Sequence, residues 1–336
     1  MTDHPPPTPP RPPKADGPVD MHVHVVGNGM GGTGCWTRLP LWRRPMAGIM
    51  LRQAGLPASA LHGDLDRLFA DRLLEWVRAS SLSAAVILAH DQVYSERGEL
   101  IEGVGTFHVP NAYVLELARQ HGEFLPAISI HPARPDALEE LERCLAGGAV
   151  MMKILPNCQN IDCNDRRYRR FWERMAAARL PLLAHTGGEH TVQVIRKEFA
   201  DPRVLRLPLE CGVTVIAGHC ATKSGLFDPD YFSIFASMVE QYPNLYGDTS
   251  AFGVPIRGRR VPVCLQEPVR SRMVHGSDFP VPISAWYPWA RRFISWSEFR
   301  QCQNTRNPLE RDYQMKRAMG FPDEYFTRIR SLLRQL

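Results

Sequence analysis

The stretch Asp20-Met21-His22-Val23-His24 places two imidazoles two positions apart within an apolar run. Successive side chains of a β-strand point to opposite faces, so residues at i and i+2 share a face. His22 and His24 are therefore predicted to point to the same side of one strand, where they can bind one metal ion. This pair is the starting point for the fold, because further potential ligands end later strands of the same kind.

Short apolar runs alternate along the chain with stretches of helical spacing. The strand candidates are residues 19–24, 84–90, 124–130, 149–155, 181–185, 213–219, 245–249 and 273–277. Amphipathic patterns with apolar residues near i, i+3, i+4 and i+7 lie between them, at 65–80, 113–120, 136–145 and 168–180. This alternation is typical of parallel βαβ units, and eight of them close into a barrel. We therefore predict an α/β fold, a (β/α)8 TIM barrel, for which 336 residues is a normal length.

An open, doubly wound sheet is the rival architecture. It would favour a G-x-G-x-x-G motif between a strand and a helix. The glycines of residues 27–34 instead follow the His-x-His pair, so the barrel is the better interpretation.

Three regions depart from the repeat. Residues 1–18 are rich in proline and poor in large apolar side chains, so we expect a disordered or polyproline tail, with a docking segment as the alternative. Residues 19–336 are expected to form a single domain. Within it, the 27–62 insertion is expected to lie over the barrel mouth as a lid. Residues 286–336 are predicted to add C-terminal helices, at 287–296, 311–320 and 324–336, that pack outside the barrel.

Composition narrows the class of protein. The 40 basic and 35 acidic residues give a formal charge of +5, a mild excess that does not resemble a nucleic-acid-binding surface. No apolar run approaches the roughly 20 residues that cross a bilayer. The eight cysteines are scattered without a C-x-x-C pair, which indicates reduced thiols. We expect a soluble, cytoplasmic protein that acts on small molecules, without a nucleic-acid or membrane partner.

Four more potential ligands end later strands: Lys153, His185, His219 and Asp278. Barrel enzymes place their chemistry at the C-terminal ends of the strands, so these side chains are expected to meet there. Imidazole and carboxylate suit a divalent ion such as zinc, and a catalytic zinc keeps one position open for water. The ion lowers the pKa of that water to about 7. Zinc is the metal we expect, although manganese, iron and cobalt accept the same ligands.

The ordered series of His-x-His on the first strand, His on the fifth and sixth, and Asp on the eighth resembles the amidohydrolase superfamily. The resemblance covers residues 19 to about 285, and MKILPN, HTGGEH and HGSDFP resemble its amidohydrolase-2 branch. It implies that His22, His24, His185 and Asp278 bind metal. It also implies that Asp278 or His219 moves protons.

Lys153 allows two interpretations. Some members of the superfamily carry a carboxylated lysine here that bridges two metals, and Lys153 and His219 would then both be ligands. Others work with one metal, and an unmodified Lys153 would polarise a substrate oxygen or bind a substrate carboxylate.

Other polar residues near the strand ends are candidates for substrate contacts. Glu189 and His190 follow the fifth strand and are expected to orient ligands or touch substrate, with a solvated loop as the alternative. His90 and His131 close the second and third strands and face the mouth. Asp248 and Thr249 end the seventh strand and are likewise candidates for substrate contacts.

Arginines form two basic clusters. Arg257 with Arg259 and Arg260 follows the seventh strand, and Arg43 with Arg44 lies in the insertion. Guanidinium groups suit carboxylates, so Arg257 is a candidate for binding an anionic substrate, although surface charge explains such clusters equally. Cys220 lies beside His219, but neighbouring strand residues face opposite ways, so we expect an inert buried thiol.

The expected function is metal-dependent hydrolysis of an amide, lactone or ester bond in a small, anionic substrate. The alternatives are metal-dependent decarboxylation of an aromatic or related acid, a TatD-like nuclease, and a non-catalytic metal-binding barrel. A nuclease fits poorly, because Lys153 stands where that group would supply a glutamate and the chain lacks a basic stripe. The family resemblance is compatible with a homodimer.

Overall fold

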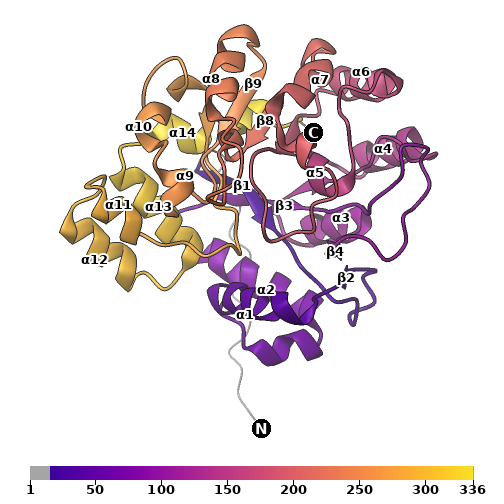
Figure 1. Ribbon diagram of the computed structural model, residues 1–336. Helices are drawn as coiled ribbons and strands as arrows, with labels where there is room; N and C mark the ends of the chain where they lie inside the picture. The colour runs from indigo at the N-terminus through magenta and orange to yellow at the C-terminus, as the bar shows by residue number, and fades with distance from the viewer. Residues whose placement is uncertain (1–15, 336) are drawn as a thin grey trace.

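Eight short parallel strands form the centre of the molecule, which the computed structural model describes over residues 16–335. Their order in the sheet follows their order in the chain. They are β1 Val19–His24, β3 Ala84–Leu88, β5 Phe124–Ile128, β6 Met151–Ile154, β7 Leu182–His185, β8 Val215–Gly218, β9 Leu245–Asp248 and β10 Met273–Val274. Figure 1 shows helices placed around these strands.

The sheet closes between its first and last strands. The Met21 amide donates to the His275 carbonyl at 3.1 Å, and the Asp278 amide donates to the His22 carbonyl at 2.9 Å. Val23 forms a parallel bridge with Phe279 just after β10. The predicted (β/α)8 barrel is therefore confirmed.

The connecting helices bury one apolar stripe each. In α2, Leu65–Arg78, the stripe is Leu65, Phe69, Leu73 and Val77, and the Asp64 carboxylate caps the helix by accepting from the Arg67 amide. The predictions for α2 and for the next three amphipathic patterns are confirmed. Helices that follow strands β3 to β9 are α3 Asn111–Gln120, α4 Ala137–Ala146, α5 Pro156–Gln159, α6 Arg169–Ala177, α7 Arg206–Glu210, α8 Phe232–Gln241, α9 Pro255–Gly258 and α10 Val261–Cys264. Short 3-10 turns lie at η3 Arg166–Tyr168, η4 Lys197–Ala200, η5 Pro202–Leu205, η6 His219–Ala221 and η7 Arg270–Arg272.

The C-terminal region after β10 is helical, as predicted, but its helices are shorter and one part lies elsewhere. It contains α11 Trp286–Ala290, α12 Trp296–Asn304, α13 Pro308–Ala318, α14 Asp323–Thr327 and α15 Ile329–Leu332. The prediction of a helix over 287–296 is wrong after residue 290, where the chain turns with Arg292 at a φ of 58°. Nor does the end of the chain pack only outside the barrel, because Ile329 and Leu333 join the core cluster of the barrel interior.

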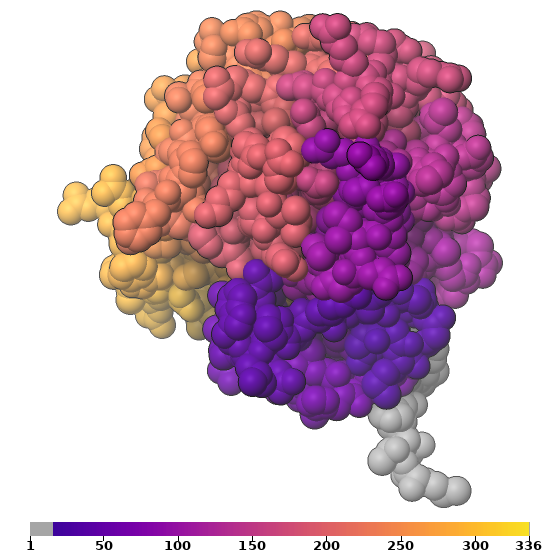
Figure 2. Space-filling model, turned by 45° about the vertical axis from the view of Figure 1, so that its right-hand side comes forward, coloured from indigo at the N-terminus to yellow at the C-terminus, as the bar shows by residue number. Residues whose placement is uncertain are grey.

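Residues 36–62, here named the outer segment, follow β1 and precede α2. The segment contains β2 Trp36–Thr37, η1 Leu41–Arg43, α1 Arg44–Gln53 and η2 Ala58–His62. Strand β2 pairs antiparallel with β4, Phe107–His108, which ties the segment to the loop after β3. In Figure 2 this indigo region forms the lower part of the visible face.

The glycine-rich stretch before the outer segment wraps around one carboxylate of α2. Asp66 accepts from the amides of Gly29 and Gly31 at 3.3 and 3.2 Å and from the Thr33 hydroxyl at 2.9 Å. A Cβ atom on Gly27 would lie 1.7 Å from an Asp66 oxygen, so only glycine fits there. These glycines serve packing around a buried acid, which agrees with the absence of a nucleotide-binding motif.

The first described residues are tied to the body of the molecule. The predicted tail lies largely outside the described residues, but the Gly17 and Pro18 carbonyls accept hydrogen bonds from Arg330 and Ser83. All eight cysteines, each within residues 16–335, are free thiols. Across that same range, no helix combines the length and the apolar character that crossing a bilayer requires.

Candidate metal centre and active site

The His-x-His pair lies on β1 next to an irregularity in the strand. Asp20 pairs with Ala85 and Val23 with Ile87, so β1 carries one residue more than β3 over this stretch, as in a β-bulge. Asp20 accepts from the His22 amide at 3.1 Å and from the Ser277 amide at 2.9 Å. The bulge and this buried carboxylate fix His22 and its neighbours against the loop after β10.

Asp278 brings three histidines together. Its Oδ1 lies 3.2 Å from His24 Nε2 and 3.4 Å from His22 Nε2, and its Oδ2 lies 4.0 Å from His219 Nε2. Its backbone φ is 67°, a left-handed conformation that a non-glycine residue adopts only when its surroundings enforce it. Burial acts to raise the pKa of Asp278, but the nearby His22, His24 and Arg257 outweigh it, so the pKa lies below its usual value.

His219 lies in a left-handed turn and is fixed by hydrogen bonds to residues at the end of β9. It begins the turn η6, in which His219, Cys220 and Ala221 all have positive φ values. The His219 amide donates to Asp248 Oδ1 at 2.8 Å, and the Ser250 hydroxyl lies 2.7 Å from its Nδ1. Its Nε2 is thereby turned toward Asp278.

Cys220 is buried within the same turn, and its thiol donates to the Asp248 carbonyl at 2.9 Å. Burial raises the pKa of that thiol well above its usual value. These observations agree with the prediction of an inert thiol.

Lys153 reaches the centre from β6. Its Nζ lies 3.0 Å from His22 Nε2, and the residue is 1 % exposed. Burial lowers the pKa of Lys153 to about 8 against the opposing charges of Asp248 and Asp278. Part of the lysine population is therefore an uncharged amine near neutral pH.

His185 and Glu189 form a second part of the site. The His185 ring lies 4.9 Å from the His219 ring, and its Nε2 has no hydrogen-bond partner within residues 16–335. Glu189 Oε2 is 3.7 Å from that nitrogen, while Glu189 Oε1 accepts from the Thr191 and Val192 amides. A buried, unpartnered ring nitrogen next to other donor atoms suits a metal ligand.

Asp248 orients ligands. Its Oδ2 lies 2.7 Å from His22 Nδ1, while its Oδ1 accepts from the amide of His219 and from the hydroxyl of Ser250. The sequence predicts a substrate contact for Asp248, whereas the structure places it behind the ligands together with Ser250, which the sequence does not mark. The only sequence signal for Ser250 is its place directly after the polar end of a strand. Thr249 points away from the site, with its hydroxyl bonded to Tyr325.

Three other candidates, His90, His131 and His190, are placed less centrally. His90 stacks on Phe107 with ring centroids 4.2 Å apart, and Phe107 lines the cavity in its place. His131 is fully buried, its amide bonded to Asp91, and is not among the residues that line the cavity within the described chain. His190 is bonded to Asp228 at 2.9 Å on the outer part of the cavity wall.

Arg257 is buried near the centre without lining the cavity. Its Nη2 donates to the Gly188 carbonyl at 3.0 Å, and its charge contributes to the low pKa of His219, for which burial is the main cause. Arg259 and Arg260 instead pair with Asp230. The basic cluster is therefore divided, and only its first member lies near the site.

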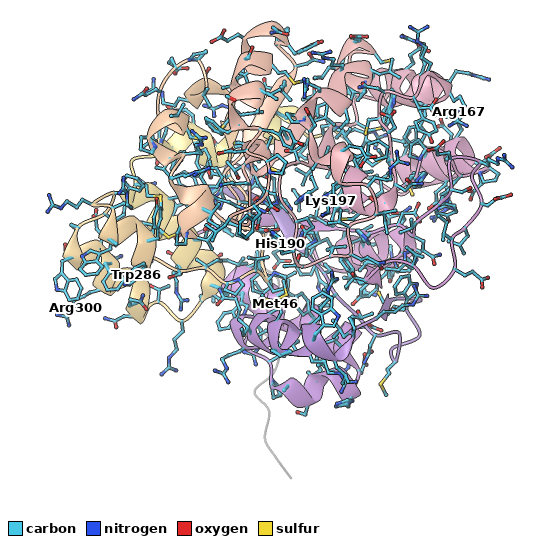
Figure 3. The ribbon with its side chains drawn as sticks, viewed as in Figure 1. Met46, Arg167, His190, Lys197, Trp286 and Arg300 are labelled. Atoms are coloured by element: carbon cyan, nitrogen blue, oxygen red, sulfur yellow. The ribbon has the colours of Figure 1, made fainter. Side chains whose placement is uncertain are left out.

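One cavity of about 370 Å³ joins the centre to the outer segment. His24, Lys153, His185, His219 and Asp278 line its inner end. Met46 of α1 and His190 line its outer part, and both are labelled in Figure 3.

The donor set fits a divalent metal ion. Ligand atoms of His22, His219 and Asp278 all lie within 4.8 Å of one another. Burial lowers the pKa of His22 to about 4 and that of His219 well below its usual value, so both rings are neutral and offer lone pairs. Neutral imidazoles and an ionised carboxylate are the ligands such an ion requires. The sequence interpretation made His219 a ligand only of a second ion, whereas the geometry groups it with His22 and Asp278.

A sequence model of the amidohydrolase family matches residues 19–294, which include every strand of the barrel. The chain belongs to the amidohydrolase family. Members of this family are metal-dependent enzymes, and in this amidohydrolase the His22, His219 and Asp278 group is a candidate metal site. No curated protein matches the chain by sequence.

Solved structures share the fold of this amidohydrolase. An uncharacterised TIM-barrel protein from Bordetella bronchiseptica aligns with a TM-score of 0.56 at 18% identity, covering 90% of this chain and 99% of that one. A probable 2-pyrone-4,6-dicarboxylic acid hydrolase from Acinetobacter baumannii gives a TM-score of 0.50 at 14% identity, over 91% and 100% of the two chains. Identities this low show the fold alone, so reaction and substrate must be argued from the site.

Proposed function

We propose that this amidohydrolase is a metal-dependent hydrolase that cleaves an amide, lactone or ester bond of a small substrate. The observation that carries the proposal is the position of Asp278. Its carboxylate lies between the ring nitrogens of His22, His24 and His219, at the inner end of a cavity that also exposes Lys153. A proton acceptor, metal ligands and a cation thus face one small volume.

We assign the metal to His22, His219 and Asp278, with His24 beside them. A bound divalent ion would act as a Lewis acid and lower the pKa of water to about 7. His185 would complete the site or begin a second one, because its Nε2 is unpartnered and its ring is close to His219. Asp248 would keep the Nδ1 of His22 occupied, so that its Nε2 faces the ion.

Asp278 is the group we assign to proton transfer. Its depressed pKa keeps it ionised near neutral pH, so it can accept a proton from the attacking water and return it to the leaving group. If His219 does not bind the ion, it is the alternative acceptor, since its ring is neutral and its Nε2 lies 4.0 Å from Asp278 Oδ2.

We assign Lys153 to stabilising the carbonyl oxygen of the substrate. As an ammonium it would donate to the oxyanion that develops when a carbonyl is attacked. As a free amine it would be open to carboxylation, and the pKa of about 8 makes that form accessible near neutral pH. A carboxylated Lys153 would join the ligands of a binuclear site.

Metal-dependent decarboxylation is the second candidate. It is favoured by the surroundings of Lys153, which stands almost fully buried at the end of a largely apolar cavity. A substrate carboxylate placed there would lose its hydration, which would ease its departure as carbon dioxide, and Lys153 in its ammonium form would supply the proton that takes its place on the carbon.

Turnover of paired substrates tests the proposal. The full-length protein, purified without chelators, would be assayed with aryl esters, lactones and anilides, and separately with aromatic acids while carbon dioxide release is measured. We expect metal-dependent hydrolysis that a chelator abolishes and added metal restores. Asp278→Asn should remove it, whereas Asp71→Asn, on the exposed side of α2, should not. Carbon dioxide release without hydrolysis would favour the decarboxylase, and no turnover of either kind would favour a non-catalytic barrel.

A further inference from the structure

The cavity has two chemically different ends. Its inner end carries the charged and polar groups of the metal centre. The lining that the outer segment and α2 contribute is mostly apolar, and it includes Met50, Leu51, Leu61, Leu65 and Phe69. A polar reacting group and the remainder of a substrate would therefore meet different surroundings.

We propose that the substrate joins one polar reacting group, neutral or singly anionic, to an uncharged apolar body. This inference rests on the proposed function, and it names the substrate class of the same site. The cavity volume of about 370 Å³ limits the size. This volume suits a small molecule rather than a polymer.

The charged groups around the outer part argue against a second anionic group. Among the described lining residues there, the only guanidinium or ammonium is that of Arg43, whose Nη1 already donates to the Thr106 hydroxyl and the Thr191 carbonyl. The carboxylate of Glu189 lies 3.7 Å from His185 at the inner end and offers no positive charge. A carboxylate buried against these apolar walls would remain largely unpaired, which is strongly unfavourable.

The inner end, in contrast, can accept one negative charge. Lys153 lines it directly, and the buried Arg257 adds positive potential behind His219. The anionic substrate expected from the arginine clusters is therefore restricted to one charge placed at Lys153. Arg259 and Arg260 do not contribute, because Asp230 engages both.

Binding of simple carboxylates tests this class without requiring turnover. Butyrate, hexanoate, octanoate and the dicarboxylate suberate would be titrated into the full-length protein by calorimetry. We expect the affinity to rise about fourfold for each methylene added between butyrate and octanoate. Suberate, which has a second charge at its far end, should bind at least about tenfold more weakly than octanoate. Equal or tighter binding of suberate would overturn the proposal and point to Arg43, whose Nε has no partner among residues 16–335.

Two variants on neighbouring positions of α1 locate the apolar site. Met50 lines the cavity, whereas Ile49 is 51 % exposed and does not line it. Met50→Asp should weaken octanoate binding about tenfold or more and leave butyrate nearly unchanged. Ile49→Asp, with the same change of charge on the same helix, should leave both affinities unchanged. Circular dichroism checks that both variants fold, and equal losses in both would contradict the assignment of the cavity wall.

The two proposals fail in distinguishable ways. A flat dependence on chain length together with metal-dependent ester hydrolysis would overturn the apolar substrate class and leave the hydrolase intact. A steep dependence on chain length without turnover of octanoyl or hexanoyl esters would leave the binding class intact and overturn the hydrolase.

Discussion

The two ends of the barrel interior are made by the same strands and differ in almost every property. At the N-terminal end, Met151 and Leu183 pack in one apolar cluster. Two residues further along the same strands stand Lys153 and His185, which line the inner end of the cavity. One pleat of a strand therefore separates a residue that stabilises the fold from one that is assigned to chemistry.

The difference shows how the barrel carries a buried polar centre. The apolar end gains free energy from burial, and Ile329 of α15 adds to it from the C-terminal end of the chain. The polar end holds ionisable groups that burial disfavours, and paired contacts such as that of His22 with Asp248 offset part of this cost. Changes at the polar end should thus affect turnover, and changes at the apolar end should affect stability.

The largest effect on turnover is expected for Asp278→Asn. The amide cannot accept a proton as the carboxylate does and is a poorer metal ligand, so turnover should fall by about 10²–10⁴-fold. Assays on metal-loaded protein measure this. A variant that binds metal and retains full turnover would remove the proton-transfer role of Asp278.

Lys153→Met should separate the effect on turnover from the effect on stability most clearly. Turnover should fall by about 10²–10³-fold, since one stabilising group for the oxyanion is lost. Burial disfavours the Lys153 ammonium, as its lowered pKa indicates, so an apolar side chain of similar length should leave the free energy of unfolding nearly unchanged. Urea unfolding of the metal-free protein tests this, because bound metal would itself stabilise the fold. A large loss of stability would contradict the assignment of turnover to the polar end and of stability to the apolar end.

Asp248→Asn should have a smaller effect, because this residue acts through His22 and His219. Removal of a partner of this kind lowers metal affinity about 10–100-fold. Competition with a fluorescent chelator measures the affinity, and turnover at saturating metal should recover most of its value. Failure to recover would mean that Asp248 contacts the substrate itself.

The smallest effect on turnover is expected at the apolar end. Leu183→Ala should lower the free energy of unfolding by about 2–5 kcal/mol, since a fully buried side chain is truncated. Turnover per folded molecule should change little. A loss of turnover as large as that of Lys153→Met, in protein shown to be folded, would show that the two ends are not separable.

Much of this arrangement could be predicted from the sequence. The strands are short runs that are buried on both faces, and the polar residues that end them mark the mouth of the barrel. Lys153, His185 and Asp278 were found in this way, because the barrel rule places the ends of all strands together. The amphipathic spacing of α2 likewise identifies a helix without further information.

Other features depend on contacts between distant parts of the chain. Periodicity does not record the extra residue in β1 or the left-handed turn at His219, both of which change where a side chain points. His90 follows the strand rule and yet lies behind Phe107, which reaches the cavity from β4. The apolar cavity wall is supplied by the outer segment, whose irregular sequence gives no spacing to interpret.

Metal content per chain tests the central claim most directly. It would be measured by plasma mass spectrometry on protein purified without chelators and with bicarbonate present, for the parent chain, Asp278→Asn and Leu183→Ala. We expect about one ion per chain, or about two if Lys153 is carboxylated, in the parent and in Leu183→Ala, and a clear loss in Asp278→Asn. A parent chain without metal, or an Asp278→Asn variant with undiminished metal, would contradict the claim.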